Sequence, residues 1–182
     1  MHFRNSIRRR GKNWLPTRWL VSFSLTAMVS CQRADLIDSI GVVEAGIFVL
    51  EPTSRSQEDQ PGSTGGIVTI APAQLVQSTR IIPCIKGVAF GCRYRFTTLG
   101  HGSTKTVAIR QVIRHPEFYD PIMKRRSSEA GGVLHQRPGS AFFAGYTLDF
   151  DFELVPGFWI MEIWQGDRVL DATVFELRYP SM

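Results

Sequence analysis

The sequence predicts an all-β protein built as a sandwich of two antiparallel sheets, and three observations support this prediction. Apolar and polar residues alternate with a period of two along several segments, which is typical of half-buried strands. Pro, Gly and short polar stretches separate these segments at the spacing of strands. No segment longer than a turn or two keeps the 3.6-residue period of a helix. Seven or eight such strands favour an immunoglobulin-like sandwich, with a small barrel as the alternative.

The strands expected in the first half of the domain follow from composition and from their turn residues. After a lead-in at 35–40, a first strand rich in Val, Ile and Phe is expected at 42–50. Strand-like segments at 67–70 and 74–82 end at prolines, and the segment 88–99 has one apolar and one basic face. A turn at 100–103 then leads to a strand at 106–114.

The second half begins with a long connection at 115–139, which is expected because prolines and glycines recur along it. The clearest strand is 142–152, where the period-2 alternation is longest. Residues 158–164 are apolar on both faces apart from Glu162, which is typical of a central strand. A hairpin turn at 165–168 connects them to a last strand at 169–179.

These strands predict a single β-sandwich domain over residues 40–179. Inside it, residues 51–66 (EPTSRSQEDQPGSTGG) contain no aliphatic or aromatic side chain. Because such a segment has no apolar surface to bury, we expect an exposed, flexible loop there.

Residues 1–31 are predicted to be a signal peptide. They hold six Lys and Arg residues and no acidic residue, and their basic part precedes the apolar run 19–30. Twelve residues are fewer than the roughly 20 that a membrane-spanning helix needs, but they fit the apolar core of a secretory signal. The alternative is a buried amphipathic helix with a basic flank.

Cys31 is the predicted lipidation site. A small residue, Ser30, precedes it at the end of the apolar run, which resembles the lipobox of bacterial lipoproteins. Met28 stands where that motif prefers Leu, so a soluble cleaved form is the alternative. In either case we expect an exported protein: the soluble form would be periplasmic, and the lipoprotein would be anchored in the outer membrane through its lipid alone.

The charge distribution argues against nucleic-acid binding. The chain has 21 Lys and Arg residues against 16 Asp and Glu, but six of the basic residues lie in 1–31, so that residues 32–182 hold 15 basic against 16 acidic residues. Binding to nucleic acid depends largely on neutralising phosphates. The nearly neutral mature chain therefore predicts no nucleic-acid partner.

Cys84 and Cys92 form an even pair once Cys31 takes lipid, and an exported protein occupies an oxidising compartment. Along one straight strand the two would lie about 26 Å apart, beyond the reach of a disulfide. A bond therefore requires the chain to reverse, for example at Lys86-Gly87. Two separately buried thiols are the alternative.

Candidate binding residues are Arg114, His115 and Trp164. Arg114 and His115 precede Pro116 at the predicted end of a strand, where they could orient a ligand or only hydrogen-bond the loop. Trp159 and Trp164 fall on opposite faces of one strand. We expect Trp159 in the core, so that an exposed Trp164 would indicate a binding surface.

The sequence contains no catalytic or metal-binding motif, and we expect no catalytic residue, metal or cofactor. Asp149, Asp151 and Glu153 share one face of the predicted strand 142–152. This row is interpreted as a solvated strand face, with a cation or partner site as the alternative.

Several residue groups, taken in order, resemble a family of exported bacterial proteins known as domain of unknown function 3859. They are Gly46-Ile-Phe, Ile82-Pro83, Phe90-Gly-Cys-Arg-Tyr94, Arg114-His-Pro116, Gly145-Tyr146 with Leu148-Asp149, and Glu153-Leu-Val-Pro-Gly-Phe-Trp159 followed by Glu162-Ile-Trp164. The resemblance spans roughly 40–178 and implies an immunoglobulin-like sandwich without an assigned activity. Cys84 and Cys92 depart from the family pattern.

Two functions are consistent with these observations. The first is a non-catalytic module of the cell envelope that binds a protein or glycan or has an accessory role, favoured by the fold and by the lack of a catalytic set. The alternative is a small hydrolase-like enzyme that uses His115 with a loop carboxylate, Glu117 or Asp120. A pocket holding His115 and a carboxylate would favour the enzyme, and a flat aromatic patch would favour the binding module.

Overall fold

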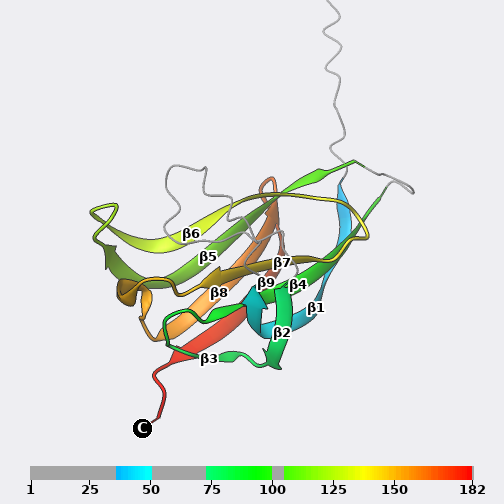
Figure 1. Cartoon of the computed structure of the whole chain (residues 1–182). Helices are drawn as coiled ribbons and strands as arrows, with labels where there is room; N and C mark the ends of the chain where they lie inside the picture. The colour runs from blue at the N-terminus through cyan, green and yellow to red at the C-terminus, as the bar shows by residue number, and fades with distance from the viewer. Residues whose placement is uncertain (1–35, 51–72, 100–104, 182) are drawn as a thin grey trace, which may run out of the picture. The chain divides into compact units, whose positions relative to one another are not determined.

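The computed structural model describes residues 36–50, 73–99 and 105–181, and this part of the chain forms two β-sheets (Figure 1). It contains no helix that is long and apolar enough to cross a bilayer. The predicted signal peptide with Cys31, the loop 51–66, the strand 67–70 and the turn 100–103 all fall outside the described residues.

The first sheet has four strands in the order β2-β1-β4-β7. These are β2 (Ala73–Ser78), β1 (Ile37–Leu50), β4 (Ala89–Thr98) and β7 (Phe142–Thr147). All neighbours pair antiparallel.

The second sheet has five strands in the order β3-β9-β8-β5-β6. These are β3 (Ile81–Pro83), β9 (Arg168–Arg178), β8 (Gly157–Gln165), β5 (Val107–Asp120) and β6 (Arg125–Gln136). The short β3 pairs parallel with β9, and the other pairs are antiparallel. The predicted sandwich is thus confirmed, and β8 lies at the centre of its sheet as expected.

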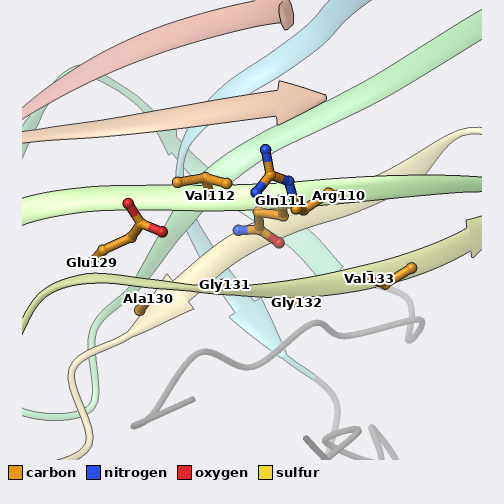
Figure 2. A pocket seen from close by; sticks show the side chains of 8 residues that line it. All are labelled: Arg110, Gln111, Val112, Glu129, Ala130, Gly131, Gly132 and Val133. Atoms are coloured by element: carbon orange, nitrogen blue, oxygen red, sulfur yellow. The ribbon is translucent and has the colours of Figure 1, made fainter. Parts of the chain in front are cut away.

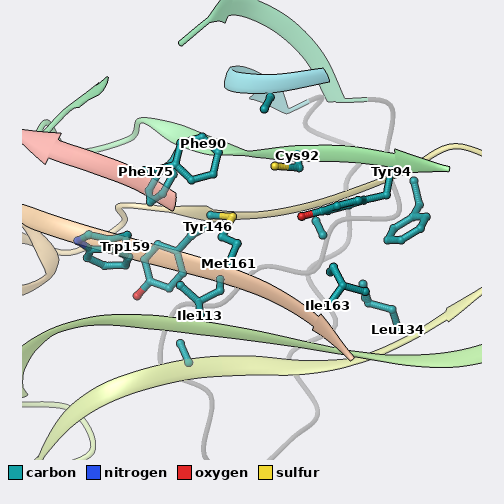
Figure 3. Packing of buried hydrophobic residues seen from close by; sticks show 14 of the residues in the cluster. Phe90, Cys92, Tyr94, Ile113, Leu134, Tyr146, Trp159, Met161, Ile163 and Phe175 are labelled. Atoms are coloured by element: carbon teal, nitrogen blue, oxygen red, sulfur yellow. The ribbon is translucent and has the colours of Figure 1, made fainter. Parts of the chain in front are cut away.

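The core lies between the two sheets and is rich in aromatic side chains. Phe90 of β4 lies edge-on to Trp159 of β8 and to Phe175 of β9, with ring centroids 5.7 and 5.4 Å away. Figure 3 shows these rings, together with Tyr146 and Met161, between the strands that carry them. The apolar face predicted for 88–99 is fully buried. Because each sheet supplies one apolar face, the alternation in the sequence determines which residues meet here.

The prediction of a long connection at 115–139 is wrong. Strand β5 continues through Pro116 to Asp120, and the chain returns as β6. The pairing of β5 with β6 is irregular between Arg114 and Phe118, and this irregularity accommodates a proline that has no N–H to donate. Strand β6 was missed because it is an edge strand rich in Arg, Ser and Gly.

The strand predicted at 142–152 ends at Thr147 instead, and a 3₁₀ turn, η1 (Asp151–Glu153), follows. Glu153 is fully buried and its carboxylate accepts hydrogen bonds from the Tyr146 hydroxyl at 2.7 Å and from the backbone N–H groups of Asp149 and Phe150. Burial raises the pKa of Glu153. The predicted row of acidic side chains on one strand face is therefore wrong, because the chain turns so that this carboxylate enters the core.

The segment predicted as one strand at 74–82 is divided between the two sheets. Its first part is β2 at the edge of the four-stranded sheet, and its last part is β3 at the edge of the five-stranded sheet. Thr79 lies between them, where its hydroxyl accepts a hydrogen bond from the N–H of Ile81. A chain that changes sheets in this way helps to close the edge of a sandwich.

Candidate functional site

One face of the five-stranded sheet packs on the core, and the opposite face, called the outer face below, carries the candidate site. The register places Arg110 of β5 opposite Trp164 of β8, and Arg114 opposite Ile160. Successive residues of a strand point to opposite faces. The even-numbered positions of β5 from 108 to 114 and of β8 therefore share the outer face.

Glu162 connects two of the predicted binding residues on this face. Its Oε1 atom accepts a hydrogen bond from Arg114 Nε at 3.2 Å, and its Oε2 atom accepts one from Trp164 Nε1 at 2.9 Å. Arg114 Nη1 also donates to Glu129 Oε2 of β6 at 2.8 Å. These two carboxylates raise the pKa of the Arg114 guanidinium, which is fully charged in any case.

Arg110 lies over the ring of Trp164, with its guanidinium carbon 5.0 Å from the ring centroid. This is a cation–π arrangement across neighbouring strands. Among the carboxylates that the structure describes, none forms an ion pair with Arg110, whose side chain is exposed. Arg110 was not singled out by sequence reasoning. The available signal was a pair of Arg residues four apart in the sequence, at 110 and 114, which places both on one strand face.

A hollow of about 210 Å³ opens on the outer face between β5 and β6. It is lined by Arg110, Gln111, Val112 and the β6 residues Glu129, Ala130, Gly131, Gly132 and Val133 (Figure 2). Gly131 has φ +152°, and a Cβ there would lie 2.1 Å from the backbone oxygen of Gln111. Only glycine fits this close approach, and the absence of side chains leaves the hollow open.

His115 does not join Arg114 on the outer face. It points into the core, stacked between Phe118 and Trp159 with ring centroids 4.5 and 4.8 Å away. Its Nδ1 atom lies 3.0 Å from the oxygen of Pro116, and its buried Nε2 atom has no partner among the described residues. Burial lowers the pKa of His115. A strand end at Pro116 would leave the side chains of residues 114 and 115 near each other. Because strand β5 continues, the two side chains point to opposite faces of the sheet.

The two carboxylates considered with His115 have other partners. Glu117 accepts a hydrogen bond from Arg126 at 2.8 Å on the surface. Asp120 is buried and accepts hydrogen bonds from the backbone N–H groups of Ile122 and Met123, at 2.8 and 3.1 Å, which stabilises the β5–β6 turn. His115 also does not line the hollow. The geometry therefore offers no general base and acid pair at this position.

Cys84 and Cys92 are separate buried thiols, and the disulfide considered for them is not formed. The backbone of Cys84 continues the edge of the five-stranded sheet, where its N–H donates to the Arg178 oxygen at 2.7 Å. Cys92 lies in the middle of β4, opposite Ala45, in the other sheet. Burial raises the pKa of both thiols. Within the described part of the chain, no cluster of three or more His, Cys, Asp or Glu side chains is arranged to bind a metal ion.

A family model described as "Domain of unknown function (DUF3859)" matches residues 37–177. The chain belongs to this family. The resemblance seen in the sequence motifs of this DUF3859 protein is thereby confirmed. None of the curated proteins matches the chain.

Among solved structures, this DUF3859 protein is similar to a crystal structure of an immunoglobulin-like protein from Pseudomonas aeruginosa. The two share 23% sequence identity with a TM-score of 0.54, over 77% of this chain and 97% of that one. At this identity the likeness shows the fold alone. The sandwich is thus immunoglobulin-like, and function has to be argued from the surface.

Proposed function

We propose that this protein is a non-catalytic binding module of the bacterial cell envelope, and that it binds a protein partner through the outer face of the five-stranded sheet. The observation that supports this proposal best is a group of exposed apolar side chains on the same sheet face as the Arg110–Trp164 pair. Phe158 of β8 and Val174 of β9 are 65% and 48% exposed, and Ile81 of β3 is 49% exposed.

These three side chains lie together because of the strand register. Phe158 and Ile81 pair with Glu176 of β9 from its two sides, and Val174 pairs with Ile160. The Glu176 side chain, ion-paired with Arg178, therefore lies between the two apolar residues. Residues that pair directly across strands point to the same face. The apolar group therefore shares the outer face with Trp164, and Ile160 and Glu162 occupy the outer-face positions of β8 between Phe158 and Trp164.

The composition of this surface favours a protein over a glycan. Arg and aromatic residues are enriched at the centres of protein interfaces, and Trp and Arg dominate their binding energy. The aliphatic side chains Ile81 and Val174 offer shape but no hydrogen bonds, whereas a sugar needs many polar contacts. Arg110 also covers one side of the Trp164 ring, where a sugar would otherwise stack.

The envelope location rests on the N-terminal sequence. A basic segment, an apolar run of 12 residues and a cysteine after a small residue support export and lipidation of Cys31. Mass spectrometry of the protein from its native host should show loss of about 30 residues, with or without a diacylglycerol on Cys31. An intact Met1 on a cytosolic protein would contradict the envelope location.

The binding face is tested by photo-crosslinking in the native host. A benzophenone amino acid replaces Phe158 on the outer face, and in a matched control it replaces Val76, an exposed residue of β2 in the other sheet. A discrete adduct from position 158 that is absent from position 76 is the expected result. No adduct at 158, or the same adduct from both positions, would refute the proposed face.

A further inference from the structure

The hollow between β5 and β6 has a cation at one end of its lining and glycines along its length. In Figure 2 the Arg110 and Glu129 side chains rise on the same side of the β5–β6 pair, while Gln111 points to the other side. The apolar side chains of Val112 and Val133 complete the wall. A group bound here would therefore meet one guanidinium and a short apolar surface.

The guanidinium of Arg110 is held in place but has no anion. Its contact with the Trp164 ring restrains the side chain, and no described carboxylate forms an ion pair with it. The neighbouring Arg114, in contrast, bonds both Glu129 and Glu162. The five N–H donors of an arginine guanidinium match the oxygens of a carboxylate or a phosphate. A guanidinium that is already restrained loses little conformational entropy when it binds such an anion.

The local charge balance selects between these two anions. Two guanidinium groups, Arg110 and Arg114, and two carboxylates, Glu129 and Glu162, make the immediate surroundings neutral in sum. A dianionic phosphate would be repelled by the carboxylates without a second free cation to offset them. A single negative charge meets half of this repulsion and can still hydrogen-bond to Arg110, so a carboxylate is favoured over a dianion.

The size of the hollow sets the size of the group. About 210 Å³ is smaller than the ~300–1,000 Å³ typical of a pocket that encloses a whole ligand. It fits one side chain with a short aliphatic stem. The hollow and the exposed apolar side chains of β8 and β9 share the outer face, so one partner that covers this face would contact both.

We infer that this hollow is the specificity pocket of the outer face and binds the carboxylate of an Asp or Glu side chain of the protein partner. The carboxylate accepts hydrogen bonds from Arg110, and its methylene groups contact Val112 and Val133. The inference depends on the proposed function only for the source of the carboxylate, since the pocket itself is a property of this chain.

The pocket is tested with propionate, which has the carboxylate and stem of a glutamate side chain. In ¹H–¹⁵N spectra of the protein, the Trp164 indole N–H signal reports on the ring under Arg110. We expect a saturable shift with sodium propionate that sodium chloride at equal ionic strength does not reproduce. In Arg110→Gln the affinity should fall about tenfold or more, the cost of a lost charged hydrogen bond. In Arg95→Gln, on the other sheet, it should not change.

Three outcomes would overturn the inference: a shift that increases linearly without saturating, an affinity unchanged in Arg110→Gln, or tighter binding of inorganic phosphate than of propionate. These outcomes are separate from a failure of the proposed function. Loss of the crosslink at position 158 with propionate binding intact would refute the protein-binding face alone. A crosslink at 158 that survives Arg110→Gln, without propionate binding, would refute the carboxylate pocket alone.

Discussion

Trp159 and Trp164 lie five positions apart on one strand, and they differ in almost every physical respect. Trp159 is fully buried, packs against Phe90, and donates its indole N–H to the oxygen of Val155 at 3.2 Å. Trp164 is half-buried under Arg110 and donates to a carboxylate. The Trp159 side chain on the inner face therefore has its packing and hydrogen-bonding partners within the fold. The outer face still has an exposed cation and exposed apolar side chains, and this difference is the basis of the proposed binding face.

The largest expected effect is on the inner face. Trp159→Ala should lower the free energy of unfolding by about 3–5 kcal/mol because it leaves a cavity among the aromatic rings. Urea unfolding followed by circular dichroism measures it. A variant that unfolds at nearly the parent concentration of urea would show that the ring does not fill the core.

A smaller loss is expected at Gly131. Gly131→Ala would place a Cβ against the backbone of Gln111 in a strained conformation, so we expect a loss of about 1–3 kcal/mol. Gly41→Ala is the matched control, because its Cβ meets no atom within 4 Å. Equal thermal stability of the two variants would contradict the close approach of β5 and β6.

Trp164→Ala should cost about 1 kcal/mol or less, since it removes an exposed cation–π contact and one surface hydrogen bond. The same urea unfolding measurement as for Trp159→Ala gives a direct comparison of the two faces. A loss as large as that of Trp159→Ala would mean that the outer face is part of the folding core.

His115→Phe is expected to have the smallest effect at neutral pH and a larger one in acid. Burial lowers the pKa of His115 below its usual value near 6.5, so the neutral ring stabilises the fold above that pH. This stability is lost as the pH falls and the unfolded state takes up a proton. Phe118, Trp159 and the Pro116 oxygen surround the ring, and Glu129 is the charged group that acts on it from β6.

Melting temperatures measured between pH 8 and pH 5 test this point. The parent should lose stability below about pH 6.5, and His115→Phe should lose less. His135→Gln, which removes an exposed histidine from β6, is the matched control. Parallel pH profiles of the parent and His115→Phe would contradict the assignment of His115 to the core.

The fold could be predicted from the sequence wherever one face of a strand meets the core. Strands β4, β8 and β9 show this in their alternation or apolar content. Strand β6 could not be predicted in this way, because it is an edge strand in which Gly131 is required by the neighbouring strand and not by the core. The pattern of 142–152 gave a strand that is too long, because Glu153 is buried through hydrogen bonds that no periodicity reveals.

The site was predicted in part. Arg114 and Trp164 were singled out, and the structure connects them through Glu162. His115 was grouped with Arg114 because a strand end was expected at Pro116; a strand that continues places neighbours on opposite faces. Arg110 and Glu129 were missed because their roles depend on cross-strand register, which is a long-range property.

The most direct test of the account combines stability and binding in one pair of substitutions. Phe158→Thr with Val174→Thr keeps residues that favour strands but removes the exposed apolar surface. The melting temperature should stay within about 4 °C of the parent, while the photo-crosslink from a benzophenone amino acid placed at Ile81 should disappear. A crosslink that persists in the folded double variant would contradict the claim that the outer face binds the partner.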